Sequence, residues 1–455
     1  MIYVLRDLSG ASFVAGAAAV GLGLSAIAAC GDSRGAADAA NPAEWTAVVD
    51  TIGDTVRVHT TGGQVWPADA RLESEVAIGV LDGTPEYQFG NIRALAAGPD
   101  GRIYVLDGHG PVVRMYAADG TYLRDVGREG EGPGEYKQPD SGLAFLSDGR
   151  LALRDPGNGR ISLYSADGEY LDSWPVAGSM NTSNPMVVTR SGIALTPVIK
   201  NLGASVTEWE RGMARYHPDG TIDTVDVPDL GHEDAMVSGE SENSSSQSSV
   251  PFTASLQVAY SPLGYFVAGV SDEYSFKLLR TDAPVVEISM DEEPVPVDPD
   301  EAAFRREQIE ESFRDRFPGW RWNGPPIPDV KPAYDGLMVS EEGRIWVQVS
   351  VPSVRHLSEE ELRRTSAARS QRRTEGARLE RPVNPFRTPV VFDVFEPTGE
   401  YLGRVTTPDG FQTYPRPVMR DRTVWAVVTD DLDVARLHRF VVAVESIDSE
   451  LARGD

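Results

Sequence analysis

The chain repeats a pattern of turns and apolar runs at an interval of 48 residues, and this interval constrains its architecture more than any other feature. Asp100-Gly101 recurs as Asp148-Gly149, and Asp119-Gly120 recurs as Asp167-Gly168. Each Asp-Gly pair stands between short runs rich in Val, Ile, Leu and Tyr, as is typical of tight hairpin turns between strands. Two hairpins in each unit predict a four-stranded antiparallel sheet.

A sheet of this kind leaves two faces and two edges exposed, so neighbouring units must cover one another. Four further units follow less regularly, within residues 187–220, 258–288, 337–402 and 417–442. Packing six units around an axis predicts an all-β fold, a six-bladed β-propeller. Residues 73–78 match the outer strand of a blade, whereas the last unit lacks one. We therefore expect this N-terminal strand to close the last blade and leave no open edge.

The domain organisation follows from composition. We expect a signal peptide over residues 1–29, a tether over 30–44, an N-terminal β segment over 45–72, the propeller over 73–445 and a tail over 446–455. Insertions are expected near residues 231–247, 298–332 and 352–388.

Two of the three insertions carry helix signals. The first is rich in Ser, Glu and Asn and is expected to be a mobile loop. Asp298-Pro299 begins the second, and Ser358-Glu-Glu-Glu361 is a capping box that begins a helix reaching about Leu379. The sequence thus predicts two helical insertions.

The N-terminal region ends in the only cysteine of the chain, Cys30. The uncharged apolar run 13–29 followed by Cys30 resembles a bacterial lipoprotein signal with its lipobox. The resemblance implies lipidation of the Cys30 sulfur and cleavage before it, and Gly31 at the next position implies the outer membrane. An ordinary secretory signal or a different start codon is the alternative.

The best-matching repeat carries a family resemblance. Residues 127–136, Asp148-Gly149 and residues 158–161 look like an NHL repeat. Together with residues 79–89 and 326–332, they resemble a group of bacterial six-bladed β-propeller lipoproteins without an assigned activity. The resemblance implies the propeller fold and a location in the cell envelope, and it implies no chemistry.

Charge and motifs narrow the function classes. A formal net charge of −27 argues against nucleic acid as a partner, because its recognition relies on basic surfaces. The sequence has no HExxH motif, no HxH pair, no Gly-x-Ser-x-Gly elbow and no P-loop. No catalytic residue can therefore be assigned from motifs.

Three groups of residues are candidate sites, each with a plainer interpretation. Trp320, Trp322 and Tyr414 are candidates for lining a ligand pocket, although aromatic residues near an insertion also serve as packing lids. A basic helix would present Arg363 and Arg364 to an acidic partner or to anionic headgroups, or it would be a solvated helix. Asp107 and Asp155 occupy equivalent repeat positions. They would bind Ca²⁺ near the axis, or they would accept hydrogen bonds from the backbone of their own turns.

The sequence favours a membrane-anchored lipoprotein whose NHL-like propeller is a binding or scaffolding module without a cofactor. Its partner would be an envelope protein, a small molecule or a glycan. One alternative is a metal-dependent, lactonase-like hydrolase or lyase with its site at the axial channel; another is an extracellular ligand-sensing domain. Several His, Asp, Glu or Asn side chains converging at one mouth of the channel would favour the enzyme.

Overall fold

The computed structural model describes residues 44–108, 110–178, 182–201, 210–241, 244–358, 360–364, 383–430 and 434–444. It divides the chain into two compact units, residues 1–40 and 41–455. The signal peptide, Cys30, the tether up to residue 43 and the C-terminal tail lie outside the described residues.

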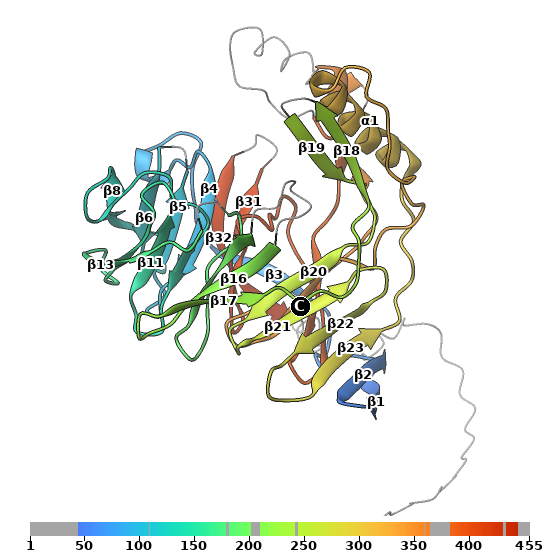
Figure 1. The fold of residues 1–455 in the computed structure, drawn as a ribbon, viewed down its shortest axis with the longest axis horizontal. Coiled ribbons are helices and arrows are strands. Elements are labelled where there is room, and N and C mark those ends of the chain that lie inside the picture. The colour runs from blue at the N-terminus through green and yellow to red at the C-terminus, as the bar shows by residue number, and fades with distance from the viewer. Residues whose placement is uncertain are drawn as a thin grey trace, which may run out of the picture. The chain divides into compact units, whose positions relative to one another are not determined.

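The first two blades are four-stranded antiparallel sheets built on the clearest repeats (Figure 1). Blade 1 consists of β4 (Ile92–Ala97), β5 (Ile103–Asp107), β6 (Val112–Tyr116) and β7 (Tyr122–Val126). Blade 2 consists of β10 (Leu143–Phe145), β11 (Leu151–Asp155), β12 (Arg160–Tyr164) and β13 (Tyr170–Pro175).

The predicted turns have the backbone that glycine permits. Gly101 has φ +84° and Gly149 has φ +85°, in the left-handed region that favours glycine. The preceding aspartates stabilise these turns, because Asp100 and Asp148 each accept a bond from a backbone N–H two residues ahead. The sequence thus specifies both hairpins locally.

The third and fourth blades follow the same strand order. Blade 3 consists of β14 (Val187–Val188), β15 (Ala194–Asn201), β16 (Glu210–Tyr216) and β17 (Ile222–Asp226). Blade 4 consists of β20 (Leu256–Ser261), β21 (Tyr265–Val270), β22 (Ser275–Leu279) and β23 (Val285–Met290).

The last two blades are joined into one eight-stranded sheet. Blade 5 consists of β24 (Tyr334–Val339), β25 (Ile345–Val349), β28 (Val391–Phe395) and β29 (Tyr401–Thr406). Blade 6 consists of β30 (Val418–Arg420), β31 (Thr423–Thr429), β32 (Ala435–Val444) and the N-terminal β3 (Ala70–Ile78).

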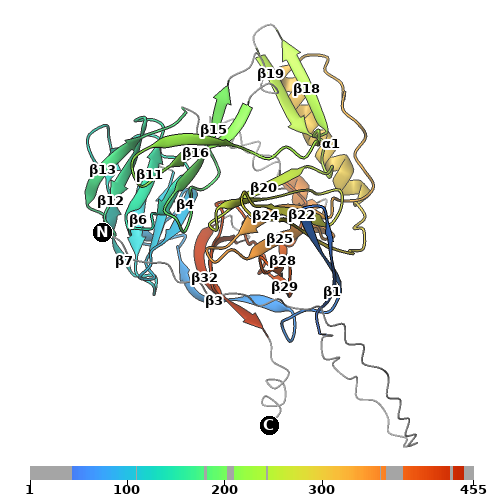
Figure 2. The same cartoon turned by 60° about the horizontal axis from the view of Figure 1, so that its bottom comes forward.

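The N-terminal strand closes the last blade, as the repeat predicts. β3 pairs antiparallel with β32 from Ala70↔Val444 to Ile78↔Leu437, and the two strands lie side by side in Figure 2. At its start β3 also pairs in parallel with β29, which joins blades 5 and 6. The closure therefore removes the open edge of blade 6.

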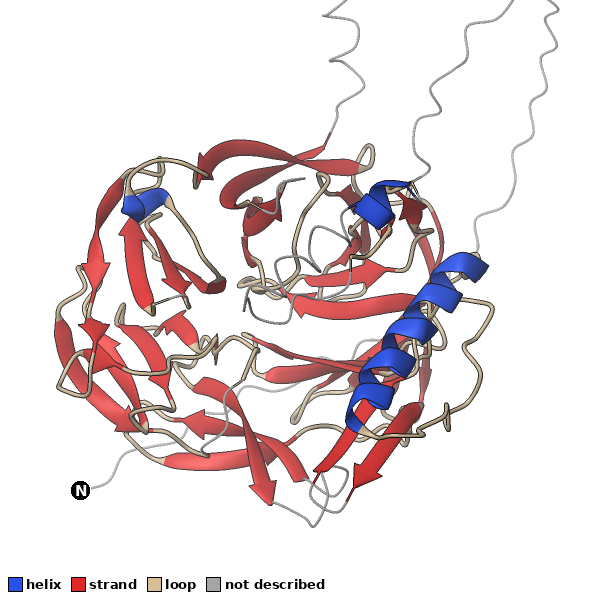
Figure 3. Cartoon of the chain, turned by 90° about the horizontal axis from the view of Figure 1, so that it is seen from above, coloured by secondary structure: helices blue, strands red, loops and turns tan. Residues whose placement is uncertain are grey.

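The blades are arranged around a central axis, with their innermost strands facing it (Figure 3). Buried side chains fill the interfaces between adjacent sheets. Tyr104 of blade 1 packs with Leu153 of blade 2, and Trp425 of blade 6 packs with Ile103 of blade 1. The described strands thus form a six-bladed β-propeller, and the ring closes between its last and first blades.

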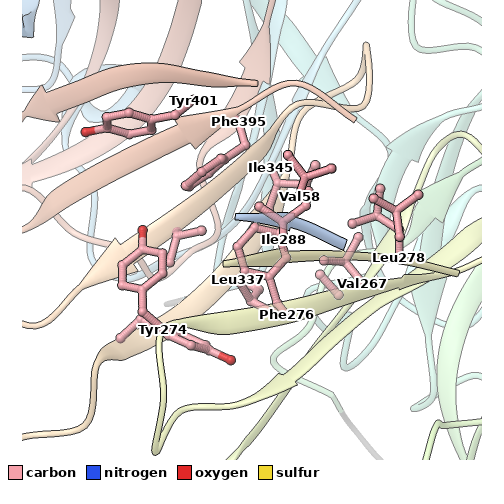
Figure 4. Close-up of a cluster of buried hydrophobic side chains, with 14 of the residues drawn as sticks. Val58, Val267, Tyr274, Phe276, Leu278, Ile288, Leu337, Ile345, Phe395 and Tyr401 are labelled. Carbon is pink, nitrogen blue, oxygen red and sulfur yellow. The ribbon is translucent and has the colours of Figure 1, made fainter. Parts of the chain in front are cut away.

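The N-terminal β segment extends blade 4, which the sequence does not predict. β1 (Thr46–Ile52) and β2 (Thr55–Gly62) form a hairpin, and β2 pairs in parallel with β23. Val58 of β2 is only 4% exposed and lies among Val267, Leu278 and Ile288 in the core between blades 4 and 5 (Figure 4). The hairpin therefore contributes to the core of the propeller.

The Ser-rich insertion is a β-hairpin, so the expectation of a mobile loop over residues 231–247 is wrong. β18 (Met236–Ser241) pairs antiparallel with β19 (Ser244–Ser249) and lies beside α1 (Pro299–Arg316; Figure 1). Val237 and Val250 are buried against Phe313 and Phe317. These few buried apolar side chains are sufficient to hold the hairpin in place, because tertiary packing outweighs the preference of the polar composition for a loop.

Both helical insertions begin as predicted. The Asp298 side chain caps α1 by accepting bonds from the N–H groups of Asp300 and Glu301. In the third insertion, Ser358 and Glu361 form the reciprocal bonds of a capping box. The remainder of that insertion between residues 365 and 382 lies outside the described residues, and short strands β26 (Val354–Arg355) and β27 (Phe386–Arg387) pair beside it.

Three short elements complete the described structure. The segment before blade 1 contains a 3-10 turn, η1 (Pro85–Tyr87). The glycine-rich linker between blades 1 and 2 contains the parallel pair β8 (Arg128–Glu129) and β9 (Glu135–Tyr136).

Candidate functional site

The innermost strands enclose a cavity of about 1300 Å³, which we call the axial cavity. It takes lining residues from all six blades, so it follows the axis of the propeller seen in Figure 3. Much of its wall is apolar. One apolar lining residue from each blade, in chain order, is Leu95, Leu143, Met186, Val258, Val339 and Val418.

The charged groups in the wall of the axial cavity are mostly arginines. Five arginines and two carboxylates line it: Arg154, Arg190, Arg211, Arg416, Arg420, Asp234 and Glu341. The chain as a whole has 69 acidic and 42 basic residues. The cavity therefore has the opposite charge balance to the rest of the protein.

Two of these arginines form ion pairs with carboxylates. Arg154 is 1% exposed and pairs with the buried Asp140, whose carboxylate also accepts bonds from the N–H groups of Gly142 and Thr182. Burial raises the pKa of the Asp140 carboxyl, while the charge of Arg154 opposes that rise. Arg420 bonds both oxygens of Glu341 at 2.5 and 2.8 Å. Their charges are compensated within the protein.

Arg416 differs from these, because among the described residues no carboxylate pairs with it. Its Nη1 donates to the Leu337 carbonyl of blade 5 at 3.2 Å. Burial lowers the pKa of Arg416 from its ordinary value. Pro415 and Pro417 flank it, and since neither has a backbone N–H, the ladder of β30 begins only at Val418. The segment thus presents an uncompensated guanidinium to the cavity.

Further polar groups gather near the start of the innermost strands β30, β10 and β4. Tyr414 contacts Ser141 of blade 2 with 3.3 Å between the hydroxyl oxygens. Ser141 Oγ also donates to the Arg93 carbonyl at 3.0 Å. Residues from blades 6, 2 and 1 therefore meet at the start of these strands.

Two bulged positions place charged residues at the same level of the innermost strands. The register shifts at Arg93 in β4 and at Asp335 in β24, and bulges of this kind re-aim a side chain. Arg93 Nη1 donates to the Pro139 carbonyl at 3.5 Å. The Asp335 carboxylate accepts a bond from Ser350 Oγ at 3.3 Å.

The Asp107 and Asp155 carboxylates each accept hydrogen bonds from backbone N–H groups in the segment just before their own blade. Asp107 accepts from the N–H groups of Gly90 and Asn91, and Asp155 accepts from those of Lys137 and Gln138, each bond being 2.9 Å long. These partners lie 16 to 18 residues upstream, so the aspartates fasten linkers rather than local turns. In the part of the chain that the structure describes, no three His, Cys, Asp or Glu side chains are grouped to hold a metal.

Trp320 and Trp322 lie in the insertion, away from Tyr414. Both rings pack on the cluster around Phe313, and Trp320 Nε1 donates to the Ser238 carbonyl at 2.7 Å. They also line a second cavity of about 580 Å³ together with Arg306, Glu310 and Arg314 of α1. Arg306 lies over the Trp322 ring at 4.8 Å. The tryptophans are therefore anchored in the insertion's own small core.

Arg363 and Arg364 belong to the first turn of the capped helix. Arg364 forms an ion pair with Glu360 and is largely exposed. The other arginines of the predicted basic stretch, at positions 369, 372, 373 and 378, lie outside the described residues. The structure thus separates the five proposed ligand-binding residues among three places.

Arg416 is a residue that reasoning from the sequence missed. The sequence did carry one signal. Arg416 is a charged residue at the start of an innermost strand, and the two clearest repeats have the uncharged Ala94 and Gly142 at this position. Its environment depends on Leu337, 79 residues earlier in the chain. Only the packing of blade 5 against blade 6 brings these groups together.

A protein-family model described as a 6-bladed beta-propeller matches residues 80–182, which contain blades 1 and 2. No match was found among curated proteins. In the part of the chain that the structure describes, no helix is long and apolar enough to cross a membrane.

Several solved structures are similar to this chain at low identity. A member of the DUF4221 family from Bacteroides vulgatus is 9% identical with a TM-score of 0.45, covering 83% of this chain and 99% of that one. A gluconolactonase from Xanthomonas campestris is 12% identical with a TM-score of 0.39, covering 82% and 100%. Virginiamycin B lyase from Staphylococcus aureus is 9% identical with a TM-score of 0.35, covering 88% and 99%. Likenesses at this level do not assign an activity to this chain.

Proposed function

We propose that this protein is a lipid-anchored cell-envelope lipoprotein whose propeller is a binding module, with the axial cavity as its binding site. The observation that carries the proposal is the cavity itself. Its volume of about 1300 Å³ is large enough for a small organic ligand, since ligand pockets usually measure roughly 300–1,000 Å³. Apolar walls with a few polar groups are the usual composition of such pockets.

The bonding of the polar groups supports binding rather than catalysis. Of the two carboxylates in the wall, Glu341 is paired with Arg420 and Asp234 lies 3.6 Å from His232, so neither is without a partner. The lactonase-like alternative predicts His, Asp, Glu or Asn side chains converging at one mouth. At the start of the innermost strands, Tyr414 and Ser141 meet the backbone carbonyl of Arg93, and the adjacent Asp140 is paired with Arg154.

The proposed anchoring rests on the sequence. The apolar run before Cys30 and the small polar residues after it fit a lipidated N-terminus with a short tether. Two or three acyl chains on Cys30 would hold the propeller at the membrane stably. A ligand bound in the axial cavity would then be held at the envelope surface.

The proposal is tested by blocking the cavity. Val258 lines the axial cavity and is half-buried, whereas Val354 lies outside it and is 57% exposed. The full-length protein, purified in non-ionic detergent, would be screened by ligand-observed NMR against sugars, sugar acids, and small aromatic acids and amides. We expect binding that Val258→Trp abolishes and Val354→Trp preserves. Binding that survives Val258→Trp, or no binding by any of these compounds, would contradict the proposal.

A further inference from the structure

The proposed function does not explain the positive charge in the wall of the axial cavity. The chain carries a formal net charge of −27, yet five of the seven charged residues in the cavity wall are arginines. Two of those arginines, Arg154 and Arg420, are paired with carboxylates. Of the remaining wall arginines, Arg190 and Arg211 are exposed, whereas Arg416 is half-buried.

Arg416 is the member of this excess with the clearest need of a partner. It donates to the uncharged Leu337 carbonyl, which accepts one of the five N–H groups that a guanidinium offers. A half-buried charge without a counter-ion is costly in the folded protein. An anion in the cavity would remove that cost by bonding the free edge of the guanidinium.

We propose that the axial cavity binds a small organic carboxylate through the guanidinium of Arg416. This inference rests on the proposed function and names the chemical class of its ligand. A planar guanidinium matches a carboxylate with two parallel bonds. The apolar wall, with Leu95, Met186 and Val258, suits the carbon body of such a molecule.

The surroundings favour a single carboxylate over a phosphate. Phosphate sites commonly combine several cations with backbone N–H groups at a helix N-terminus or a glycine-rich loop. Arg416 instead stands between two prolines, which supply no N–H groups. The guanidinium of Arg416, with polar lining side chains such as Gln257 and Asn184, fits a monoanion with further hydrogen-bonding groups.

The test compares matched aromatic compounds on the full-length protein in non-ionic detergent. Benzoate, benzamide, benzylammonium and phenyl phosphate share one ring and differ in charge. We expect NMR titration to give at least tenfold tighter binding of benzoate than of benzamide, since hydrogen bonds to charged groups are the strong ones. Arg416→Gln should weaken benzoate about tenfold and leave benzamide unchanged, whereas Arg416→Lys should retain part of the preference.

A matched control separates the site from general electrostatics. Arg57 is an exposed arginine on β2, so Arg57→Gln changes the net charge equally without touching the cavity. Equal losses in Arg57→Gln and Arg416→Gln, each variant being folded by circular dichroism, would overturn the inference. Preference for phenyl phosphate over benzoate would overturn the assignment to a carboxylate.

The two proposals fail in different ways. If benzoate and benzamide bind equally and Val258→Trp blocks both, the cavity is a binding site and the inference about its ligand is wrong. If none of the four compounds binds, and the screen of sugars and acids also finds no ligand, the proposed function itself is wrong.

Discussion

The Tyr274 hydroxyl of blade 4 donates a 2.9 Å hydrogen bond to the Asp393 carboxylate of blade 5. Asp393 is fully buried and also accepts bonds from Tyr401 and from two nitrogens of Arg404, all between 2.9 and 3.0 Å. Burial and the charge of Asp393 raise the pKa of Tyr274 well above its ordinary value, so its phenol stays neutral and donates. One carboxylate therefore connects two blades.

Removing this carboxylate should destabilise the propeller strongly. Asp393→Ala leaves Arg404 without its main partner and two buried hydroxyls unbonded, so we expect a loss of about 3–5 kcal/mol in the free energy of unfolding. Tyr274→Phe keeps Asp393 bonded by Tyr401 and Arg404 and should cost only about 1–2 kcal/mol. Urea denaturation measures both. Asp226→Ala, which removes an exposed partner of Lys200, is the control and should cost less than about 1 kcal/mol.

Stability should fall in mild acid because of a histidine at the ring closure. His438 on β32 contacts Ser74 of β3 at 2.8 Å, and burial, followed by the charge of Arg436, lowers its pKa below the ordinary 6.5. The unfolded chain therefore binds the proton more readily, and stability decreases as the pH falls below about 6.5. Melting temperatures of wild type and His438→Gln between pH 7.5 and 5 test this. An equal decline in both proteins would exclude His438 as the cause.

The two N-terminal β segments should contribute unequally to folding. A chain starting at residue 64 lacks β1 and β2 and loses the burial of Val58, which costs roughly 1.5–3 kcal/mol, so it should fold with a lower melting temperature. A chain starting at residue 80 also lacks β3 and exposes the edge of β32 and its apolar neighbours. We expect that chain to aggregate. Both lack Cys30, so anchoring does not differ; equal melting temperatures would contradict the closure.

The repeat aspartates should be structural clamps. Both carboxylate oxygens of Asp107 accept hydrogen bonds from backbone N–H groups. In Asp107→Asn the side-chain NH₂ would face one of these donors, so we expect a loss of about 1–3 kcal/mol in the free energy of unfolding, with the fold retained. Asp155→Asn should behave alike. The exposed Asp119 bonds Thr121 N–H through one oxygen, so Asp119→Asn should be nearly neutral. Elemental analysis should find no metal lost from either clamp variant; loss of stoichiometric Ca²⁺ or Zn²⁺ would favour the enzyme instead.

Lipidation at Cys30 remains a prediction from the sequence. Cys30→Ser should move the protein from the detergent phase to the aqueous phase in Triton X-114 partition, or leave an unprocessed precursor, because the sulfur that would be acylated is lost. Ser33→Ala is the matched control, since it changes a nearby residue, keeps Cys30 and should behave like wild type. Unchanged partition and migration of Cys30→Ser would rule out the anchor.

Local chemistry accounts for what the sequence determined alone. Asp-Gly turns, strand periodicity and helix caps act over a few residues, so the repeat at 48 residues predicted the hairpins of blades 1 and 2, and the capping box predicted the helix start at Ser358. The same offset predicted that β3 completes blade 6. β3 matches an outer strand but has no inner strands before it, and in a closed ring the last blade is the one that lacks an outer strand.

Long-range packing decided the rest. β2 found its partner β23 some 230 residues away, and the Ser-rich hairpin became ordered by burying Val237 against α1. Asp107 bonds a linker rather than its own turn, and Arg416 acquires its environment from blade 5. Register between distant strands, and the burial of a charge, depend on which surfaces meet in the closed ring. No pattern within a short stretch of sequence carries that information.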